Sequence, residues 1–136
     1  MESRPTGVRR CVPGQSLTIL WSDGDTLFEG DLSARGIHGG GFAEISGKST
    51  LDADSGLVDL TTVSGKGGLL LLDPTDIFIN SDGAAGPAAP GASTISNVWI
   101  SSQLDAGTDV VISTNIGGTQ AGNITVGRLD SSAIAA

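Results

Sequence analysis

Several residue types are scarce or missing in this chain of 136 residues, and each scarcity narrows the possible folds. Cys11 is the only cysteine, so no disulfide can form within the chain. Aromatic residues are few, with two tryptophans, three phenylalanines and no tyrosine. A β-sandwich, whose core usually relies on aromatic side chains, is therefore disfavoured.

Long apolar segments are also missing. No run approaches the roughly 18 apolar residues that a membrane-spanning helix needs. The first residues, "MESRPTGVRRCVPGQSL", lack the apolar stretch of about 7–15 residues that follows the basic part of a signal peptide. No window keeps apolar residues at helical spacing over three turns. We expect no membrane span, no export signal and almost no helix.

Basic side chains are fewer than acidic ones, and the formal net charge is −8. Three arginines (Arg4, Arg9 and Arg10) lie in the first ten residues, against Glu2. Residues 11–136 carry four basic and fourteen acidic side chains. An acidic surface repels phosphate backbones and anionic membranes, so we do not expect nucleic acid as a partner.

Residue sets for catalysis and metal binding are missing as well. His38 is the only histidine and no Gly-x-Ser-x-Gly elbow is present, so we interpret His38 as a solvated corner residue. Cys11 and His38 alone do not make a zinc site, which needs three or four ligands. We expect no cofactor. Calcium stays open, because "SDGD" (22–25) supplies some oxygen ligands although no calcium-binding repeat is present.

Glycine, in contrast, is abundant. The 21 glycines show no period of three, so we interpret them as turn residues. Between them lie short apolar runs rich in Val, Ile, Leu and Thr, which are typical of strands. The expected strands cover residues 16–22, 26–31, 41–46, 56–62, 68–72, 76–80, 97–101, 109–113 and 123–126.

The strands share one form, as "GGFAEIS", "SGLVDLT" and "GGLLLLD" show. One such strand cannot bury its apolar face alone, whereas stacked neighbours can. The sequence therefore predicts an all-β fold, a parallel β-helix (β-solenoid) with turns of about twenty residues. We expect it to span residues 15–136, with a disordered N-terminal segment at 1–14 and a Gly/Ala/Pro-rich loop at 81–94.

Alternation along the strands predicts which side chains face the interior. We expect the inward residues to be Ala43, Ile45, Val110, Ile112, Ile124 and Val126. The corresponding outward residues are Glu44, Val111 and Thr125.

Five stretches, in this order and spacing, resemble a known family: "ILWSDGDTLFEGDLSARG" (19–36), "GGGFAEISGK" (39–48), "GKGGLLLLDPTDIFI" (65–79), "LDAGTDVVIST" (104–114) and "GNITV" (122–126). They resemble the passenger region of filamentous-haemagglutinin-like exoproteins, the secreted partners of bacterial two-partner secretion. The resemblance covers about residues 16–126. It implies a right-handed β-helix, a role in adhesion at the cell surface or in secreted form, and an outer-membrane partner transporter for the full-length protein. Since signal peptide and export motif are not seen, we expect a fragment or a truncated reading frame.

Three functions follow for such a segment. It could adhere to a host-cell or glycan surface, act as a spacer, or cleave or bind carbohydrate with paired aspartates. Trp21 and Trp99 are the candidate ligand-contact residues, because exposed indole rings stack on sugars. The aspartate pairs are Asp23/Asp25, Asp52/Asp54 and Asp73/Asp76. Aspartate at turns usually caps its own backbone, so we predict a non-enzymatic adhesin or spacer.

Overall fold

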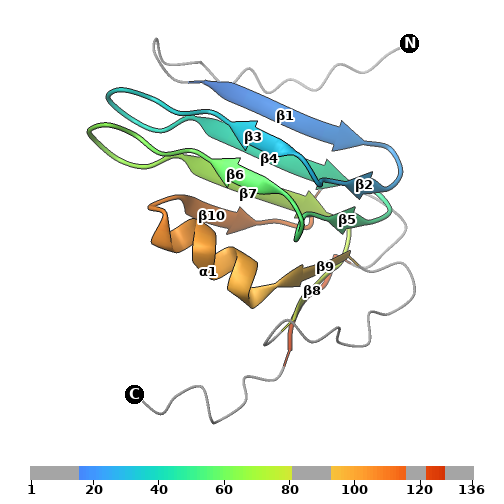
Figure 1. The fold of residues 1–136 in the computed structure, drawn as a ribbon. Coiled ribbons are helices and arrows are strands. Elements are labelled where there is room, and N and C mark those ends of the chain that lie inside the picture. The colour runs from blue at the N-terminus through green and yellow to red at the C-terminus, as the bar shows by residue number, and fades with distance from the viewer. Residues whose placement is uncertain (1–15, 81–92, 116–121, 128–136) are drawn as a thin grey trace, which may run out of the picture.

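The computed structural model describes residues 16–80, 93–115 and 122–127, which form eleven strands and one helix, α1 (Asn97–Asp105) (Figure 1). The all-β prediction is thus confirmed in outline. The expected disordered segment at 1–14 lies outside the described residues. The strands are β1 (Leu17–Ser22), β2 (Thr26–Leu27), β3 (Asp31–Ser33), β4 (Phe42–Gly47), β5 (Leu51–Asp52), β6 (Leu57–Asp59), β7 (Leu69–Pro74), β8 (Ile77–Asn80), β9 (Ser93–Ser96), β10 (Asp109–Ile112) and β11 (Ile124–Val126).

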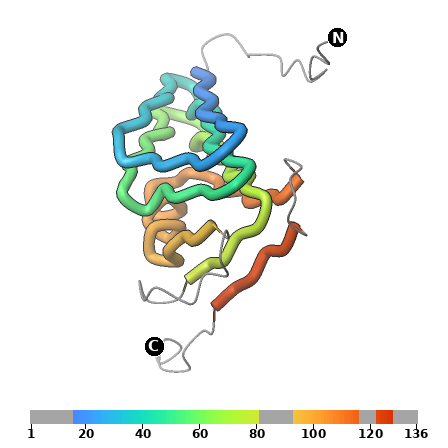
Figure 2. The backbone as a smooth tube through the Cα atoms, turned by 90° about the vertical axis from the view of Figure 1, so that its right-hand side faces the viewer, coloured from blue at the N-terminus to red at the C-terminus, as the bar shows by residue number. Residues whose placement is uncertain are grey.

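All pairings between these strands are parallel, and they stack the chain in layers. The largest sheet has the order β1-β4-β7-β10. Leu17 lies beside Phe42, and Phe42 beside Leu69, so the chain returns after 25 and then 27 residues. β2 likewise pairs with β5, and β3 with β6. β1–β3 therefore form a first layer and β4–β6 a second layer directly below it (Figures 1 and 2).

The stretch of chain between β7 and its next partner in the main sheet, β10, is longer than the two before it. Leu69 lies beside Asp109, 40 residues on, because β8, β9 and α1 intervene. β9 pairs with β8 and lies against β5, whose Leu51 N–H donates to the Ser93 hydroxyl (2.8 Å). The predicted loop was therefore wrong at residues 93 and 94, which belong to β9, where Ser93 and Ile95 are buried. Residues 81–92 lie outside the described residues.

Alternation correctly predicted the interior of the main sheet. Ala43 and Ile45 are fully buried while Glu44 is only partly so. In β10, Val110 and Ile112 are half-buried and Val111 is exposed, as expected. The prediction was wrong for β11: Ile124 and Val126 are 47% and 59% exposed. β11 pairs only with β8 and ends its sheet, so no further described strand covers it.

Residues 97–101, predicted as a strand, instead begin α1, and this prediction was wrong. The Ser96 hydroxyl accepts a hydrogen bond from the Val98 N–H and caps the first turn. After the last turn, Gly107 adopts a φ of 82°. Its N–H and that of Thr108 donate to the Leu104 and Gln103 carbonyls, a Schellman motif. Residues 97–105 therefore form a helix because both of its ends are capped, although the segment has no apolar stripe.

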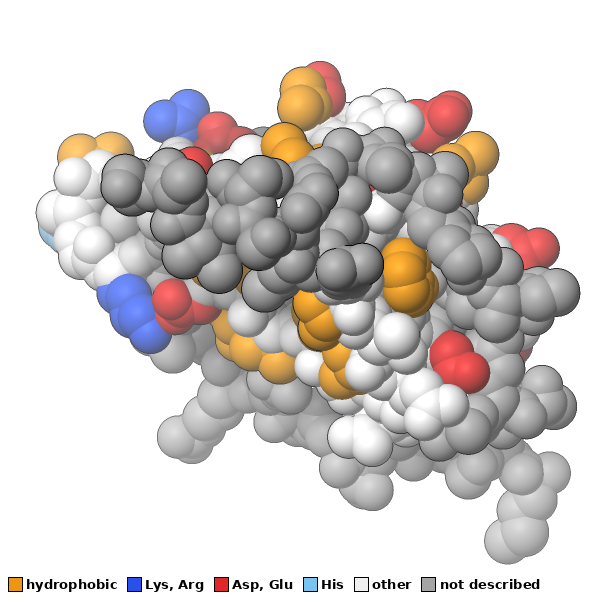
Figure 3. Space-filling model, turned by 90° about the horizontal axis from the view of Figure 1, so that it is seen from below, with side chains coloured by type: hydrophobic (Ala, Val, Ile, Leu, Met, Phe, Trp, Pro, Cys, Tyr) orange, Lys and Arg blue, Asp and Glu red, His pale blue; other side chains and the backbone are white. Residues whose placement is uncertain are grey.

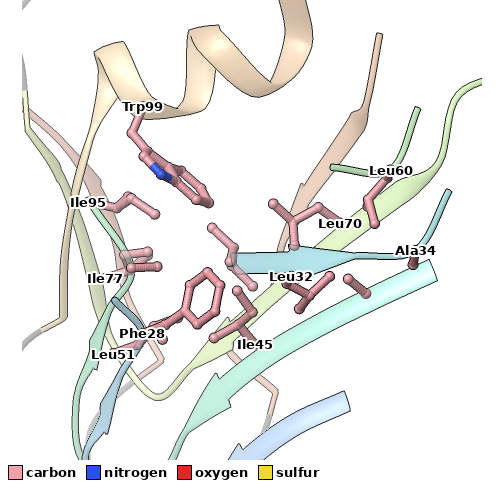
Figure 4. Packing of buried hydrophobic residues seen from close by; sticks show 13 residues of the cluster. Phe28, Leu32, Ala34, Ile45, Leu51, Leu60, Leu70, Ile77, Ile95 and Trp99 are labelled. Atoms are coloured by element: carbon pink, nitrogen blue, oxygen red, sulfur yellow. The ribbon is translucent and has the colours of Figure 1, made fainter. Parts of the chain in front are cut away.

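The core runs through the stack and ends against α1 (Figure 4). From α1, Trp99 enters it on the side of Ile95 and Ile77 (Figure 4). Its indole N–H donates to the Gly56 carbonyl (3.0 Å), which joins α1 to the start of β6. The buried apolar residues are Phe28, Leu32, Ala34, Ala43, Ile45, Leu51, Ala53, Leu60, Leu70, Leu72, Ile77, Ile95 and Trp99.

Glycine allows the layers to approach each other at a corner. A Cβ added at Gly40 would lie 2.1 Å from the Leu60 carbonyl oxygen and 2.2 Å from the Gly68 N. Both are backbone atoms, and the Gly68 N–H itself donates to the Leu60 carbonyl. A side chain at Gly40 would therefore force the second layer away from the third.

Replacing Gly40 with alanine should lower the free energy of unfolding by about 1–3 kcal/mol, the usual effect of overpacking. Thermal or urea unfolding would measure it. Gly24→Ala is the matched control, because the nearest atom to an added Cβ there is the Ser22 Oγ at 3.9 Å. Equal stabilities for the two variants would contradict the close approach at this corner.

Candidate functional site

The outward side of the main sheet presents a row of apolar side chains, which we call the outer face. Register brings Leu17, Phe42 and Leu69 side by side, one above the other. Because side chains alternate, these point away from the buried Ala43 and Leu70. The row is interrupted on β4, where register places Glu44 between Ile19 and Leu71 and Ser46 beside Trp21. Soluble monomers rarely expose large apolar patches, and such patches usually bind something. The outer face comprises Leu17, Ile19, Trp21, Phe42, Leu69, Leu71 and Val111.

Trp21 lies at the end of β1 on this face and is 50% exposed. The Lys48 ammonium stands 5.1 Å from the centroid of its ring and also pairs with Asp23 (2.6 Å). This contact is a cation–π interaction, which orients the indole ring. Trp21 therefore fits the predicted role of a surface aromatic residue with an accessible ring.

Trp99 lies elsewhere. It is 8% exposed, and its indole N–H is already bonded to Gly56. The two tryptophans predicted as ligand contacts are not brought together, since one faces outward on β1 and the other fills the core beneath α1 (Figure 4). Of the two, Trp21 is the one that a ligand can reach without unfolding the helix.

The three aspartate pairs hold the chain's own backbone and side chains. In the first pair, Asp23 accepts from Lys48, and Asp25 from the Thr50 hydroxyl (2.9 Å). The other contacts run from Asp54 N–H to Asp52 (3.3 Å), Ser96 N–H to Asp54 (2.8 Å), Asn115 N–H to Asp73 (3.0 Å) and Asn123 N–H to Asp76 (2.6 Å). All but the Asp52 contact join segments at least 25 residues apart, so these carboxylates link layers.

His38 is exposed at the corner between β3 and β4. Its Nδ1 lies 3.2 Å from the Ser64 hydroxyl, and that hydroxyl also donates to the Ile37 carbonyl. Within residues 16–80, 93–115 and 122–127, no three His, Cys, Asp or Glu side chains gather as a metal site would require. Among the same residues, no helix has the length and apolar character to cross a membrane.

Two aspartates have shifted acidities, for different reasons. Partial enclosure of the Asp54 carboxyl raises its pKa; the Ser96 N–H bond opposes this, and the Asp52 charge adds to it. The pKa of Asp59 is lowered, first by the Thr61 hydroxyl (2.6 Å) and then by the Thr61 N–H (3.0 Å). Arg35, 3.5 Å away, contributes less.

Asp59 should therefore stabilise the fold only when it is ionised. Its folded pKa lies below the ordinary 3.8, so the stabilisation is present above that value and is lost as the pH falls through the folded pKa. Asp59→Asn should melt below the wild type at pH 7, and the difference should close below pH 3.8. Thermal melts from pH 2 to pH 7, with Asp105→Asn as control, test this. A gap that persists at the lowest pH would rule it out.

The sequence predicted Trp21 as a ligand contact and Val111 as an outward residue, but it did not indicate that they share one face with Leu17, Ile19, Phe42, Leu69 and Leu71. The signal was present, because Leu17, Ile19 and Trp21 give "LTILWS" an apolar outward side, and "GLLLL" is apolar on both sides of the strand. No family model, curated protein or solved structure matches this chain.

Proposed function

We propose that the chain is a segment of a right-handed parallel β-helix and that it acts as a non-enzymatic adhesion module. Support for the β-helix comes from the parallel layers, whose β1, β4 and β7 pair in register with returns of 25 and 27 residues. The right hand follows the strong preference of parallel crossover connections. This architecture accords with the resemblance to filamentous-haemagglutinin-like exoproteins of two-partner secretion.

The observation that carries the adhesive role is the outer face. Its exposed members on β1 are Leu17, Ile19 and Trp21. An aromatic ring flanked by aliphatic side chains on a rigid sheet can bind an apolar protein surface or the apolar face of a sugar. The paired aspartates already accept hydrogen bonds from the chain's own N–H and hydroxyl groups. This favours adhesion over sugar cleavage, because a glycosidase keeps two carboxylates free at the reacting bond.

In the cell, the proposal places this segment in a secreted or surface-bound exoprotein. The full-length protein would cross the outer membrane through its partner transporter. The spacer role is the second candidate, since a stack of layers spans distance whether or not its outer face binds.

Binding by the purified chain to immobilised glycans and to cultured epithelial cells separates the two roles. An adhesin should bind, and Trp21→Ala should weaken binding roughly thirtyfold, the effect of removing an aromatic residue worth about 2 kcal/mol. Val63→Ser is the control, because Val63 is 80% exposed in the connection after β6, outside the outer face. Wild-type chain that binds neither surface would refute adhesion and leave the spacer.

A further inference from the structure

The end of the stack at β1–β3 is hollow. Two adjoining depressions of about 280 and 480 Å³ share Leu20, Leu27 and Phe28 as lining residues. Leu20 points to the interior side of β1, yet no further layer lies above it among the described residues. β1 also pairs only with β4, so its other edge has no described strand partner. Unpaired edges of this kind recruit other chains unless they are covered.

The rim of this hollow is acidic. Asp25, Glu29 and Asp31 line the two depressions. Asp25 accepts from Thr50, but neither the Glu29 nor the Asp31 carboxylate has a hydrogen bond or ion pair within the described part of the chain. Two unpaired carboxylates beside apolar side chains fit a cover that carries both positive charge and apolar groups.

The described residues supply no cation for this rim. Their three basic side chains are already paired, Arg35 with Asp59, Lys48 with Asp23 and Lys66 with Asp109. The remaining cations of the chain are Arg4, Arg9, Arg10 and Arg128. Arg128 follows β11, which lies beyond β8 at the opposite end of the stack (Figure 1). The three arginines that remain all precede β1.

The N-terminal residues also have the right reach and composition. Residues 1–15 end where β1 begins, beside the hollow. Fifteen extended residues span up to about 50 Å, enough to cross a layer whose strands are at most six residues long. Val8 supplies an apolar side chain between Arg4 and Arg9, and Cys11 and Val12 supply two more directly after Arg10. Pro5 favours an extended chain, which suits a segment that crosses an edge.

A second copy of the chain fits the hollow less well. The opposite end exposes apolar side chains too (Figure 3), and it carries Asp105 on α1 and Asp109 on β10, of which Asp109 is paired with Lys66 (2.6 Å). Stacking two copies end to end would bring the Asp105 carboxylate toward the acidic rim without a free cation among the described residues to offset it, and like charges oppose such a contact.

We propose that residues 1–15 dock in cis over the first layer, with their arginines against Glu29 and Asp31 and their apolar side chains over Leu20, Leu27 and Phe28. The segment covers the free edge of β1 and closes the core at this end. Docking is electrostatic at the rim, so raised salt weakens it.

Cys11 is the only thiol and lies in the proposed cover, so its reaction rate with an aromatic disulfide reagent reports docking. The folded chain should react roughly tenfold more slowly than a peptide of residues 1–15, since two or three surface ion pairs hold the segment. Glu29→Lys should accelerate the reaction roughly two- to fivefold, the effect of one ion pair lost. Asp105→Lys, the same charge change at the other end, should leave the rate unchanged.

Several results would overturn the proposal. Wild-type chain that reacts as fast as the peptide shows an undocked segment. So do equal rates for Glu29→Lys and Asp105→Lys. A salt titration of the wild type needs no variant: the rate should rise toward that of the peptide, and a flat response contradicts rim docking. Concentration-dependent dimers in sedimentation, with Cys11 at the peptide rate, would assign the hollow to a second copy.

Discussion

Backbone hydrogen bonds between one layer and the next are the interaction on which everything else in this structure depends. Each strand of the main sheet finds its partners 25 or more residues away, so no strand is complete until the next pass of the chain is in place. The parallel register then fixes which side chains align. Ala43 and Ile45 meet Leu70 and Leu72 inside, and the same register lines up the outer face outside.

Where the strands end, side chains continue the contact between layers. Asp54, Asp73 and Asp76 accept N–H groups from segments 42 or 47 residues on, which keeps the layers joined at corners that have no strand pairing. Gly40 permits backbone-to-backbone contact at another corner. The aspartates that suggested sugar chemistry in the sequence therefore hold layers together here, and the contact surface that we propose is the outer face.

The sequence predicted the regular layers well and the irregular third layer poorly. Strands at β1, β4 and β7 follow from alternation and glycine boundaries. The helix α1 was not predicted, because its buried residues, Trp99 and Gln103, form no apolar stripe. Its only sequence signals are the residues that cap its two ends. Ile124 was predicted to be buried because apolar residues alternate along its strand, but such residues are buried only where another layer covers the strand. The local sequence shows which side chains share one face of a strand, and so predicts that Trp21 points outward. It does not show how many neighbouring strands cover that strand.

Nuclear Overhauser contacts between backbone protons of neighbouring strands test the central claim, the parallel stacking of layers, most directly. We expect contacts from Leu17 to Phe42, from Phe42 to Leu69 and from Leu69 to Asp109, in parallel register throughout. Contacts that instead join strands within one layer, such as β1 to β3 or β4 to β6, in antiparallel register would contradict the parallel stacking, and with it the outer face and the hollow above β1.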